Sequence, residues 1–512
     1  MNNRLYLIVF GLMCFLTSSP TVAQDSIPLF QSLRLKSQSE NLFNTFYYYN
    51  PANMSGYSSY STSLFEVKYA SQNNALYLLQ EGKEQTGLEV YTSSYKKLKN
   101  NRSIWGHAKY VNQKHKDVQW NDNIDTKEIA PYVMADSTAG TMKYEAYEFA
   151  GGYTKQFERW KIGSEFSYNA HMGYRAKDPR PKNISSLMRL KVGATYQIYK
   201  DWAIGGFGEV NKYTQNTSVK FANQTQQASL YQMQGMGEWN YYFSGKVKDV
   251  IFERFGYVGG VEVSNKDGRD FVVGMQVESN NLRKNISGSG IGGNDALELN
   301  RLSTVKNKFY VAKFFDLSEA TRIGLKYQYY TDQRKGIDNY YSNIDKKIEK
   351  LLEKQNYQNN KTSHLVEGYF HLLKDNYTIR ANPFVQIEES KEKVKESNKY
   401  QNYSYAYVGV KGEYSRALNS ISQLSVKPYI AYRKVVKEEV NLGLQGTKEP
   451  IQSWLLNDYE YYKTDYITWG VSTMYSLQQR GLPFYVSVDY NQVKFKTEKD
   501  NNYIGFTIGV MF

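Results

Sequence analysis

The chain contains almost no cysteine. The one cysteine among its 512 residues, Cys14, lies within the apolar run from Leu5 to Leu16, which follows a basic residue and precedes the small residues Thr21-Val22-Ala23. This order is typical of a secretory signal, so we expect residues 1–23 to be a signal peptide cleaved after Ala23. The mature chain then has no cysteine, which excludes disulfides, thiolate metal sites and a cysteine nucleophile.

Long apolar runs and linkers are also missing. Beyond residue 23 no stretch approaches the roughly 20 apolar residues of a membrane helix, and the mean hydropathy is −0.63. Only 10 prolines and 37 glycines are spread along the chain, without a Gly/Ser tract or a block of charge, so we expect one large unit. In contrast, aromatic residues are abundant, with 48 Tyr, 24 Phe and 7 Trp. This excess of tyrosine is typical of the aromatic girdles of outer-membrane barrels.

Positive charge is plentiful but dispersed. The chain has 64 Lys and Arg against 50 Asp and Glu, a formal charge of +14. The cations recur in predicted turns, as at Lys96, Lys97 and Lys200, rather than along one helix or patch. We therefore expect no nucleic-acid partner, and some attraction for anionic solutes.

Alternation with a period of two dominates the chain and is clearest at its end. One face of the last segment carries Ile504, Phe506, Ile508, Val510 and Phe512. A terminal Phe preceded by apolar residues at every second position resembles the signal that the barrel-assembly machinery recognises. We therefore assign Phe506, Ile508, Val510 and Phe512 as an assembly signal and the machinery as a partner. Thr507 departs from the pattern, because that signal usually has Gly there.

Upstream, alternating segments of about ten residues form hairpins around tight turns, the length that a tilted membrane strand needs. Between the hairpins lie longer polar segments, at 114–143, 174–184, 215–253, 280–304, 333–361, 389–402 and 436–465. We expect 344–354 to be helical. The second face of the strands is rich in Lys, Glu, Gln and Tyr, which suits a wet lumen better than the core of a soluble sandwich.

These patterns predict an all-β protein, a transmembrane antiparallel β-barrel of about 18 strands (range about 14–20) in the bacterial outer membrane. Short turns would face the periplasm, long loops would be extracellular, and outer-membrane lipid would surround the barrel. We expect the barrel to span residues 61–512, and residues 24–60 to be a periplasmic or hatch-like segment.

A series of landmarks between residues 50 and 190 carries a family resemblance. They are Asn50-Pro51-Ala52, Gln80-Glu81-Gly82, Ser94 to Leu98, Trp105 to Tyr110, Pro131 to Ser137 and, most specifically, Tyr174 to Asn183 with its Asp-Pro-Arg-Pro core. This part resembles an uncharacterised family of large outer-membrane β-barrels, often encoded beside TonB-dependent transporters and surface lipoproteins. The resemblance implies a fold and a location, and a TonB-dependent transporter or a surface lipoprotein as a partner.

The Asn-Pro-Ala landmark also resembles the motif that follows the N-terminal hatch in barrels of the fatty-acid-transporter type. A simple turn before the first strand is the favoured interpretation.

Arg175, Asp178 and Arg180 lie in a segment that two prolines stiffen, directly after a strand directed outward. One interpretation is an inward-folded constriction loop whose guanidinium groups bind or filter anions. The favoured alternative is that Asp178 and the arginines pair with each other and brace the loop.

A second loop carries Trp120, Tyr132 and Asp136, aromatics interleaved with acids. It is either an external surface for a sugar, peptide or partner protein, or a packed lid. The sequence leaves both interpretations open.

Motifs for catalysis are lacking. The five histidines, His107, His115, His171, His364 and His371, have no HExxH or other short ligand spacing, so we expect no metal site. No Gly-x-Ser-x-Gly elbow is present, and the glycine-rich segment 287–293 lacks the Lys-Ser/Thr of a phosphate loop. We expect no cofactor and no enzymatic activity, with an outer-membrane hydrolase as the least favoured option.

The leading functional hypothesis is an accessory barrel of a TonB-dependent nutrient-uptake system. The alternatives are a passive, porin-like diffusion channel and a structural barrel that docks a partner.

Overall fold

The structure is a computed structural model that describes residues 41, 43–223, 228–245, 247–287, 296–344 and 347–512. The predicted signal peptide lies outside these residues, as does nearly all of the glycine-rich segment 287–293.

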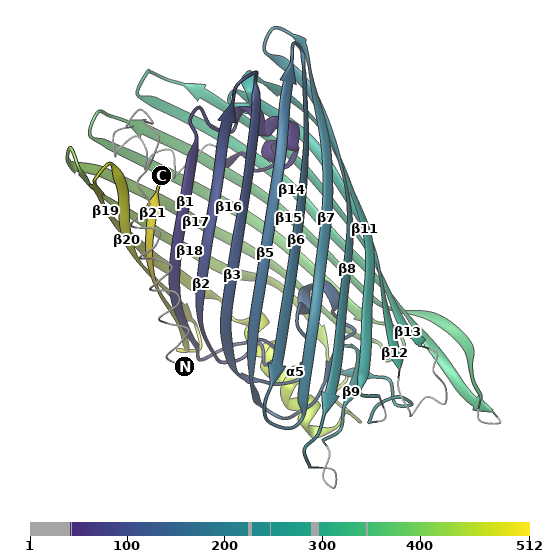
Figure 1. The fold of residues 1–512 in the computed structure, drawn as a ribbon. Coiled ribbons are helices and arrows are strands. Elements are labelled where there is room, and N and C mark those ends of the chain that lie inside the picture. The colour runs from purple at the N-terminus through teal and green to yellow at the C-terminus, as the bar shows by residue number, and fades with distance from the viewer. Residues whose placement is uncertain (1–40, 42, 224–227, 246, 288–295, 345–346) are drawn as a thin grey trace.

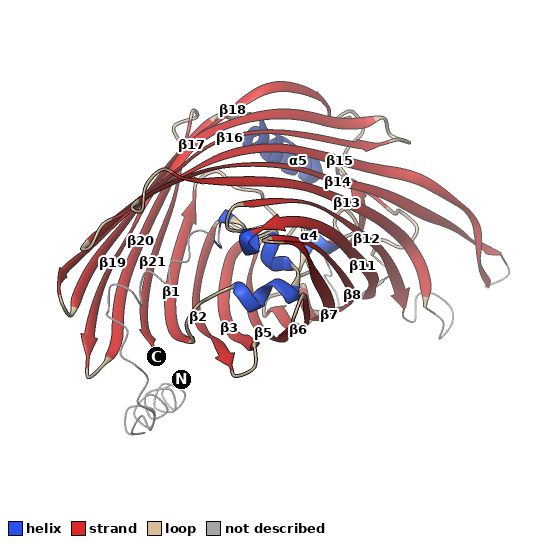
Figure 2. Cartoon of the chain, turned by 90° about the horizontal axis from the view of Figure 1, so that it is seen from above, coloured by secondary structure: helices blue, strands red, loops and turns tan. Residues whose placement is uncertain are grey.

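The described residues form a closed barrel of 18 antiparallel strands, in which strands adjacent along the chain pair with each other (Figures 1 and 2). The first and last strands also pair, with Leu64 opposite Met511, and so close the barrel. The fold predicted from period-two alternation is therefore confirmed. The strands are β1 (Thr62–Asn74), β2 (Glu84–Leu98), β3 (Arg102–Val118), β5 (Gly140–Phe157), β6 (Trp160–Arg175), β7 (Arg180–Tyr199), β8 (Trp202–Lys220), β11 (Asp249–Asn265), β12 (Phe271–Ser287), β13 (Leu297–Asp316), β14 (Thr321–Ile344), β15 (Lys347–Leu373), β16 (Tyr377–Val394), β17 (Lys399–Asn419), β18 (Ser422–Asn441), β19 (Tyr466–Gln479), β20 (Leu482–Phe495) and β21 (Asp500–Met511).

Strand β8 shows how the sequence determines which side faces lipid. Its burial alternates along its whole length. Ile204 and Val210 are 46% and 43% exposed on the outside, while Phe207 and Tyr213 are buried on the inside. Because successive side chains of a strand point to opposite faces, one sequence supplies both an apolar outer surface and an inner wall.

The two ends of the barrel differ in their connections. At one end the strands are joined by tight turns, as at Lys200-Asp201 between β7 and β8 and Arg480-Gly481 between β19 and β20. The other end carries the three longest described connections, 119–139, 221–248 and 442–465. In outer-membrane barrels tight turns face the periplasm and longer loops face outside, so this end is extracellular. The protein is a bacterial outer-membrane β-barrel.

Several predicted loop limits were wrong. Segment 333–361 is almost entirely strand, because β14 continues to Ile344 and β15 begins at Lys347. The helix predicted at 344–354 is wrong for the same reason. The segments 174–184 and 389–402 shrink to the turns 176–179 and 395–398. These strand ends are rich in polar residues and their apolar residues do not follow a regular period of two, so no strand could be predicted from alternation.

An N-terminal segment lies inside the barrel near its periplasmic end, seen as the purple coil in Figure 1 and within the ring of strands in Figure 2. It contains two short 3-10 helices, η1 (Tyr47–Tyr49) and η2 (Pro51–Gly56). The Asn50 side chain caps η2 by accepting from the Ala52 amide at 3.0 Å and donates to Glu262 of β11 at 2.7 Å. The Asn-Pro-Ala landmark therefore both makes a turn and attaches the segment to the inner wall.

The long extracellular connections fold into the barrel mouth. They form a three-stranded sheet of β4 (Met134–Ala135), β9 (Tyr231–Gly235) and β10 (Glu238–Trp239), a short helix α4 (Thr126–Ile129) and the longer α5 (Glu449–Lys463). We call the connections 119–139, 221–248 and 442–465 together the plug. Among the described helices, none is long and apolar enough to span a membrane.

Candidate functional site: the extracellular plug

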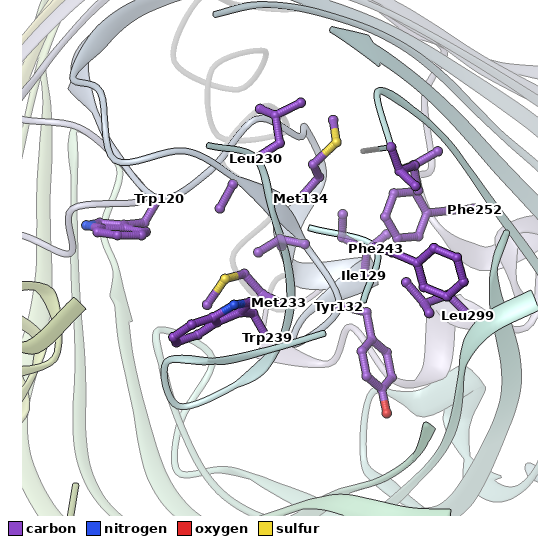
Figure 3. Close-up of a cluster of buried hydrophobic side chains, with 14 of the residues drawn as sticks. Trp120, Ile129, Tyr132, Met134, Leu230, Met233, Trp239, Phe243, Phe252 and Leu299 are labelled. Carbon is purple, nitrogen blue, oxygen red and sulfur yellow. The ribbon is translucent and has the colours of Figure 1, made fainter. Parts of the chain in front are cut away.

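The plug has its own hydrophobic core, which is continuous with the barrel wall (Figure 3). Ile129, Tyr132 and Met134 of the first connection are fully buried, and they belong to the same cluster as Phe252 of β11 and Leu299 of β13. These wall residues point inward, where a water-filled pore would have polar side chains. This part of the wall therefore packs against the plug.

The plug lies in close contact with the wall at Gly336 of β14. A Cβ atom on Gly336 of β14 would collide with the Tyr132 hydroxyl. Any larger residue at this position would therefore push the plug away from the wall.

Helix α5 is joined to the first connection by aromatic and polar contacts. Trp454 stacks on Trp120 with ring centroids 5.2 Å apart and its indole N–H donates to Asp458 at 2.8 Å. Asn457 donates to the Tyr77 carbonyl at 2.8 Å. Burial raises the pKa of Asp458 to about 7, although hydrogen bonds from Asn457 and Trp454 lower it.

Arg175, predicted as a constriction residue, is buried in the plug. Its side chain is 1% exposed, and its Nη2 donates to Asp122 at 3.1 Å and to Asp136. Its other donors reach the carbonyls of Pro179 at 2.8 Å and Thr138 at 3.2 Å. No solute in the lumen can reach this guanidinium, so the expectation that it binds or filters anions does not fit its place. It joins the end of β6 to the first connection.

The two acids at this arginine share one cation. Burial raises the pKa of Asp122 well above its ordinary value, and the neighbouring Asp136 raises it further, while Arg175 lowers it. One arginine therefore holds a carboxyl pair together in a nearly dry environment.

Asp178 and Arg180 form a separate and more exposed pair. Arg180 Nε lies 2.7 Å from Asp178 Oδ1, and Asp178 Oδ2 accepts from the amides of Ala222 at 2.8 Å and Asn223 at 3.0 Å. This carboxylate therefore ties the turn between β6 and β7 to the start of the second plug connection. The arrangement matches the bracing interpretation for this pair.

The expected external aromatic loop does not present its aromatics to solvent. Trp120, Tyr132 and Asp136 are all at most 2% exposed. The physical reason is that the loop turns inward and completes the plug core. These residues therefore belong to a packed lid.

The predicted assembly residues lie on the outside of the last strand. Phe506, Ile508 and Phe512 are 46%, 63% and 54% exposed on the lipid side, and Val510 lies on the same face. Backbone hydrogen bonds of 2.8 and 3.0 Å join Phe512 to Ser63 at the closing seam. Recognition by the assembly machinery stays a prediction.

Two of the five histidines pair with acids. His107 Nε2 lies 3.0 Å from Glu148, and His171 Nδ1 lies 2.8 Å from Asp125 of the plug. Within the described residues no group of three potential metal ligands converges.

Most of the residues that hold the plug carry no recognisable motif in the sequence. Asp122, Asp458 and Trp454 were not selected, because their partners are far away in the chain. A usable signal was present in the run Leu230 to Trp239, where apolar residues are too dense for a solvated loop.

Comparison with known proteins gives a family. A model described as a family of unknown function (DUF6850) matches residues 51–512. No curated protein matches. Among solved structures, the chain is similar to the ferric yersiniabactin uptake receptor FyuA from Yersinia pestis, with 8% identity over 89% of this chain and 80% of that chain and a TM-score of 0.41. The ferric-catecholate import receptor Fiu from E. coli K12 is similar with 8% identity, coverages of 89% and 82% and a TM-score of 0.41. At these values the likeness carries no argument about function.

Proposed function

Since the chain belongs to the DUF6850 family, whose function is not established, we propose from its own geometry that it is a plugged outer-membrane barrel whose extracellular surface binds a partner. The partner would be a component of a TonB-dependent nutrient-uptake system, and the barrel its accessory subunit. That part of the proposal comes from the resemblance of residues 50–190. No catalytic role is part of it.

The observation that carries the proposal is the plug. A barrel of 16 to 18 strands would otherwise leave an aqueous channel. Here three connections enter the mouth and share a core with Phe252 and Leu299 of the wall. A structure of this kind reduces free diffusion and leaves the outer surface as the place where the barrel can act.

A projecting hairpin supplies a surface for the partner. Strands β14 and β15 have 24 and 27 residues, more than twice the roughly 9–11 that cross a membrane. The hairpin extends beyond the rest of the barrel wall, at the lower right of Figure 1. Leu351 and Leu352 near its tip are 60% and 51% exposed. They lie at a β-bulge, because Tyr340 pairs with Leu352 and Tyr341 with Lys350, and both leucine side chains are open to solvent at this height.

The test is isolation of the protein from its native membrane in several mild detergents, followed by mass spectrometry. We expect an outer-membrane transporter or a surface lipoprotein at equal stoichiometry. Substitution of both Leu351→Asp and Leu352→Asp should weaken binding of the partner by at least about 100-fold, since each removes roughly 1.5–3 kcal/mol of apolar burial. Leu456→Asp, at a leucine of α5 that is 46% exposed, is the matched control. A barrel that runs alone in every detergent would contradict the proposal.

A diffusion channel is the second candidate, favoured by the wet side of the lumen. A cavity of about 230 Å³ lies along β1, β2 and β21, lined by polar side chains including Lys68, Gln72, Gln85 and Glu89. Planar-bilayer recording distinguishes the two candidates. A plugged accessory barrel should show little steady conductance, whereas steady ion flow through the native protein would favour the channel.

A further inference from the structure

A pocket rich in aromatic residues opens where the plug meets the ends of the longest strands. Its volume is about 270 Å³, and residues 234–243 of the plug form one side. The opposite side comes from the ends of β14, β15 and β16 and from the turn after β16. The size is slightly below the roughly 300–1,000 Å³ of sites for drug-sized ligands. A ligand or ligand segment the size of a single sugar ring would therefore suit it.

The aromatic rings in the pocket wall combine a fixed and an open surface. Trp239, labelled in Figure 3, is only 7% exposed. It packs edge-on to Tyr231 with ring centroids 5.5 Å apart, which fixes its orientation. Tyr241, whose ring centroid lies 4.6 Å from that of Trp239, is 72% exposed. Tyrosine and tryptophan present a flat apolar face together with a polar edge. Such a pair suits a ligand that has both C–H faces and hydroxyl groups.

The pocket also contains polar groups that make no hydrogen bond with the described residues. The Gln234 side chain makes no hydrogen bond within the described part of the chain. The Ser397 hydroxyl is buried, and it likewise has no partner among the described residues. An unsatisfied buried polar group costs about 1–3 kcal/mol, which a ligand with hydroxyl groups would recover. A purely apolar ligand would leave these polar groups without a hydrogen bond.

The charges at the pocket are already balanced. Glu238 is paired with Lys399 at 2.7 Å, and Glu396 with Lys354 at 2.6 Å. The Tyr340 hydroxyl also donates to Glu396, at 2.5 Å. A cation would compete with a lysine already in place, and an anion would meet two carboxylates. The carboxylate oxygens can still accept hydrogen bonds from a neutral ligand.

We propose that this pocket, between Tyr241 of the plug and the strand ends at Tyr340 and Ser397, is a binding site for a neutral carbohydrate. The ring of Tyr241 packs against a sugar face, while Gln234, Ser397 and the two glutamates exchange hydrogen bonds with the hydroxyl groups. The site needs no partner protein, so it can be tested on the purified barrel alone and its failure would leave the docking proposal untouched.

The experiment is isothermal titration of the detergent-purified full chain with four neutral hexasaccharides, namely maltohexaose, cellohexaose, mannohexaose and xylohexaose. We expect at least one to bind. Tyr241→Ala should raise its Kd by about 5–10-fold, and Gln234→Ala by a similar factor. Because Tyr241 is exposed, its loss should not disturb folding. Tyr199→Ala removes a tyrosine that is 64% exposed at the periplasmic end and should leave Kd unchanged.

Two further ligands test the charge argument. Hexamers of galacturonic acid and of glucosamine carry negative and positive charge and should bind more weakly than the best neutral sugar. The proposal is overturned if none of the neutral sugars binds, if Tyr241→Ala binds as well as the native protein, or if a charged hexamer binds best.

Discussion

Trp454 of α5 stacks on Trp120 of the first plug connection, with the two rings inclined by 12°. The contact joins two segments more than 300 residues apart in the chain, and both indoles are buried. The plug is thus one packed body, assembled from three connections.

Removal of this stack should release α5 while the barrel stays folded. Truncating a buried tryptophan to alanine costs about 3–5 kcal/mol. We therefore expect Trp454→Ala to speed amide hydrogen exchange across Glu449–Lys463 by at least about 100-fold. Leu456→Ala, at an exposed position of the same helix, should change it little. Equal protection in both variants would show that α5 does not depend on the stack.

Loss of the Arg175 guanidinium should destabilise the plug much more than loss of the neighbouring exposed pair. Arg175→Met leaves Asp122 and Asp136 buried without their cation, which costs about 3–5 kcal/mol. Arg180→Met breaks a pair whose arginine is 48% exposed and should cost less than about 1 kcal/mol. Resistance of the plug to limited proteolysis measures the loss of stability in both variants. Similar cleavage rates for the two variants would contradict the bracing role of Arg175.

The N-terminal segment should leave the inner wall when a single methyl group is added there. A Cβ on Gly193 of β7 would collide with the Asn50 amide oxygen, whereas a Cβ on Gly208 of β8 would meet nothing within 4 Å. Gly193→Ala should therefore make residues 43–60 sensitive to added protease, while Gly208→Ala should behave as the native protein. Resistance of both variants would mean that the segment adapts to the added methyl group.

The barrel could be predicted from sequence because the patterns that define its strands and turns are local in the chain. Alternation within about ten residues decides which side chains face lipid. Tight turns such as Arg480-Gly481 can be predicted from their residue types. Strand number and topology followed from these two signals alone.

The plug could not be predicted in the same way, because its contacts are not local. The sequence suggested a constriction residue or a pair with Asp178 for Arg175, because its actual partners, Asp122 and Asp136, lie in a distant connection. For the same reason the sequence left open whether Trp120 belongs to an external surface or to a packed lid. The strands beyond the membrane were missed because a sheet with water on both faces needs no apolar period.

Docking of α5 should weaken as the pH rises, because Asp458 is buried in its protonated form. Burial raises its pKa to about 7, against about 3.9 for an exposed aspartate. Between these two values the docked state binds more protons than the undocked state, so the free energy of docking declines as pH increases through this window. Docking of the helix should be strongest near pH 4. The stabilisation that protonated Asp458 contributes to docking should be lost above about pH 7. Asp458→Asn keeps a neutral side chain and should remove the dependence.

A spin label on α5 can measure this change. The only cysteine of the chain, Cys14, lies in the predicted signal peptide, so Leu456→Cys offers a single exposed attachment site on the mature protein. We expect label mobility to increase from pH 5 to pH 8 in the otherwise native protein and to stay constant with Asp458→Asn. Because the substitution removes only the titrating group, an equal increase in both proteins would assign the pH response to another residue, and constant mobility in both would show that Asp458 stays docked when ionised.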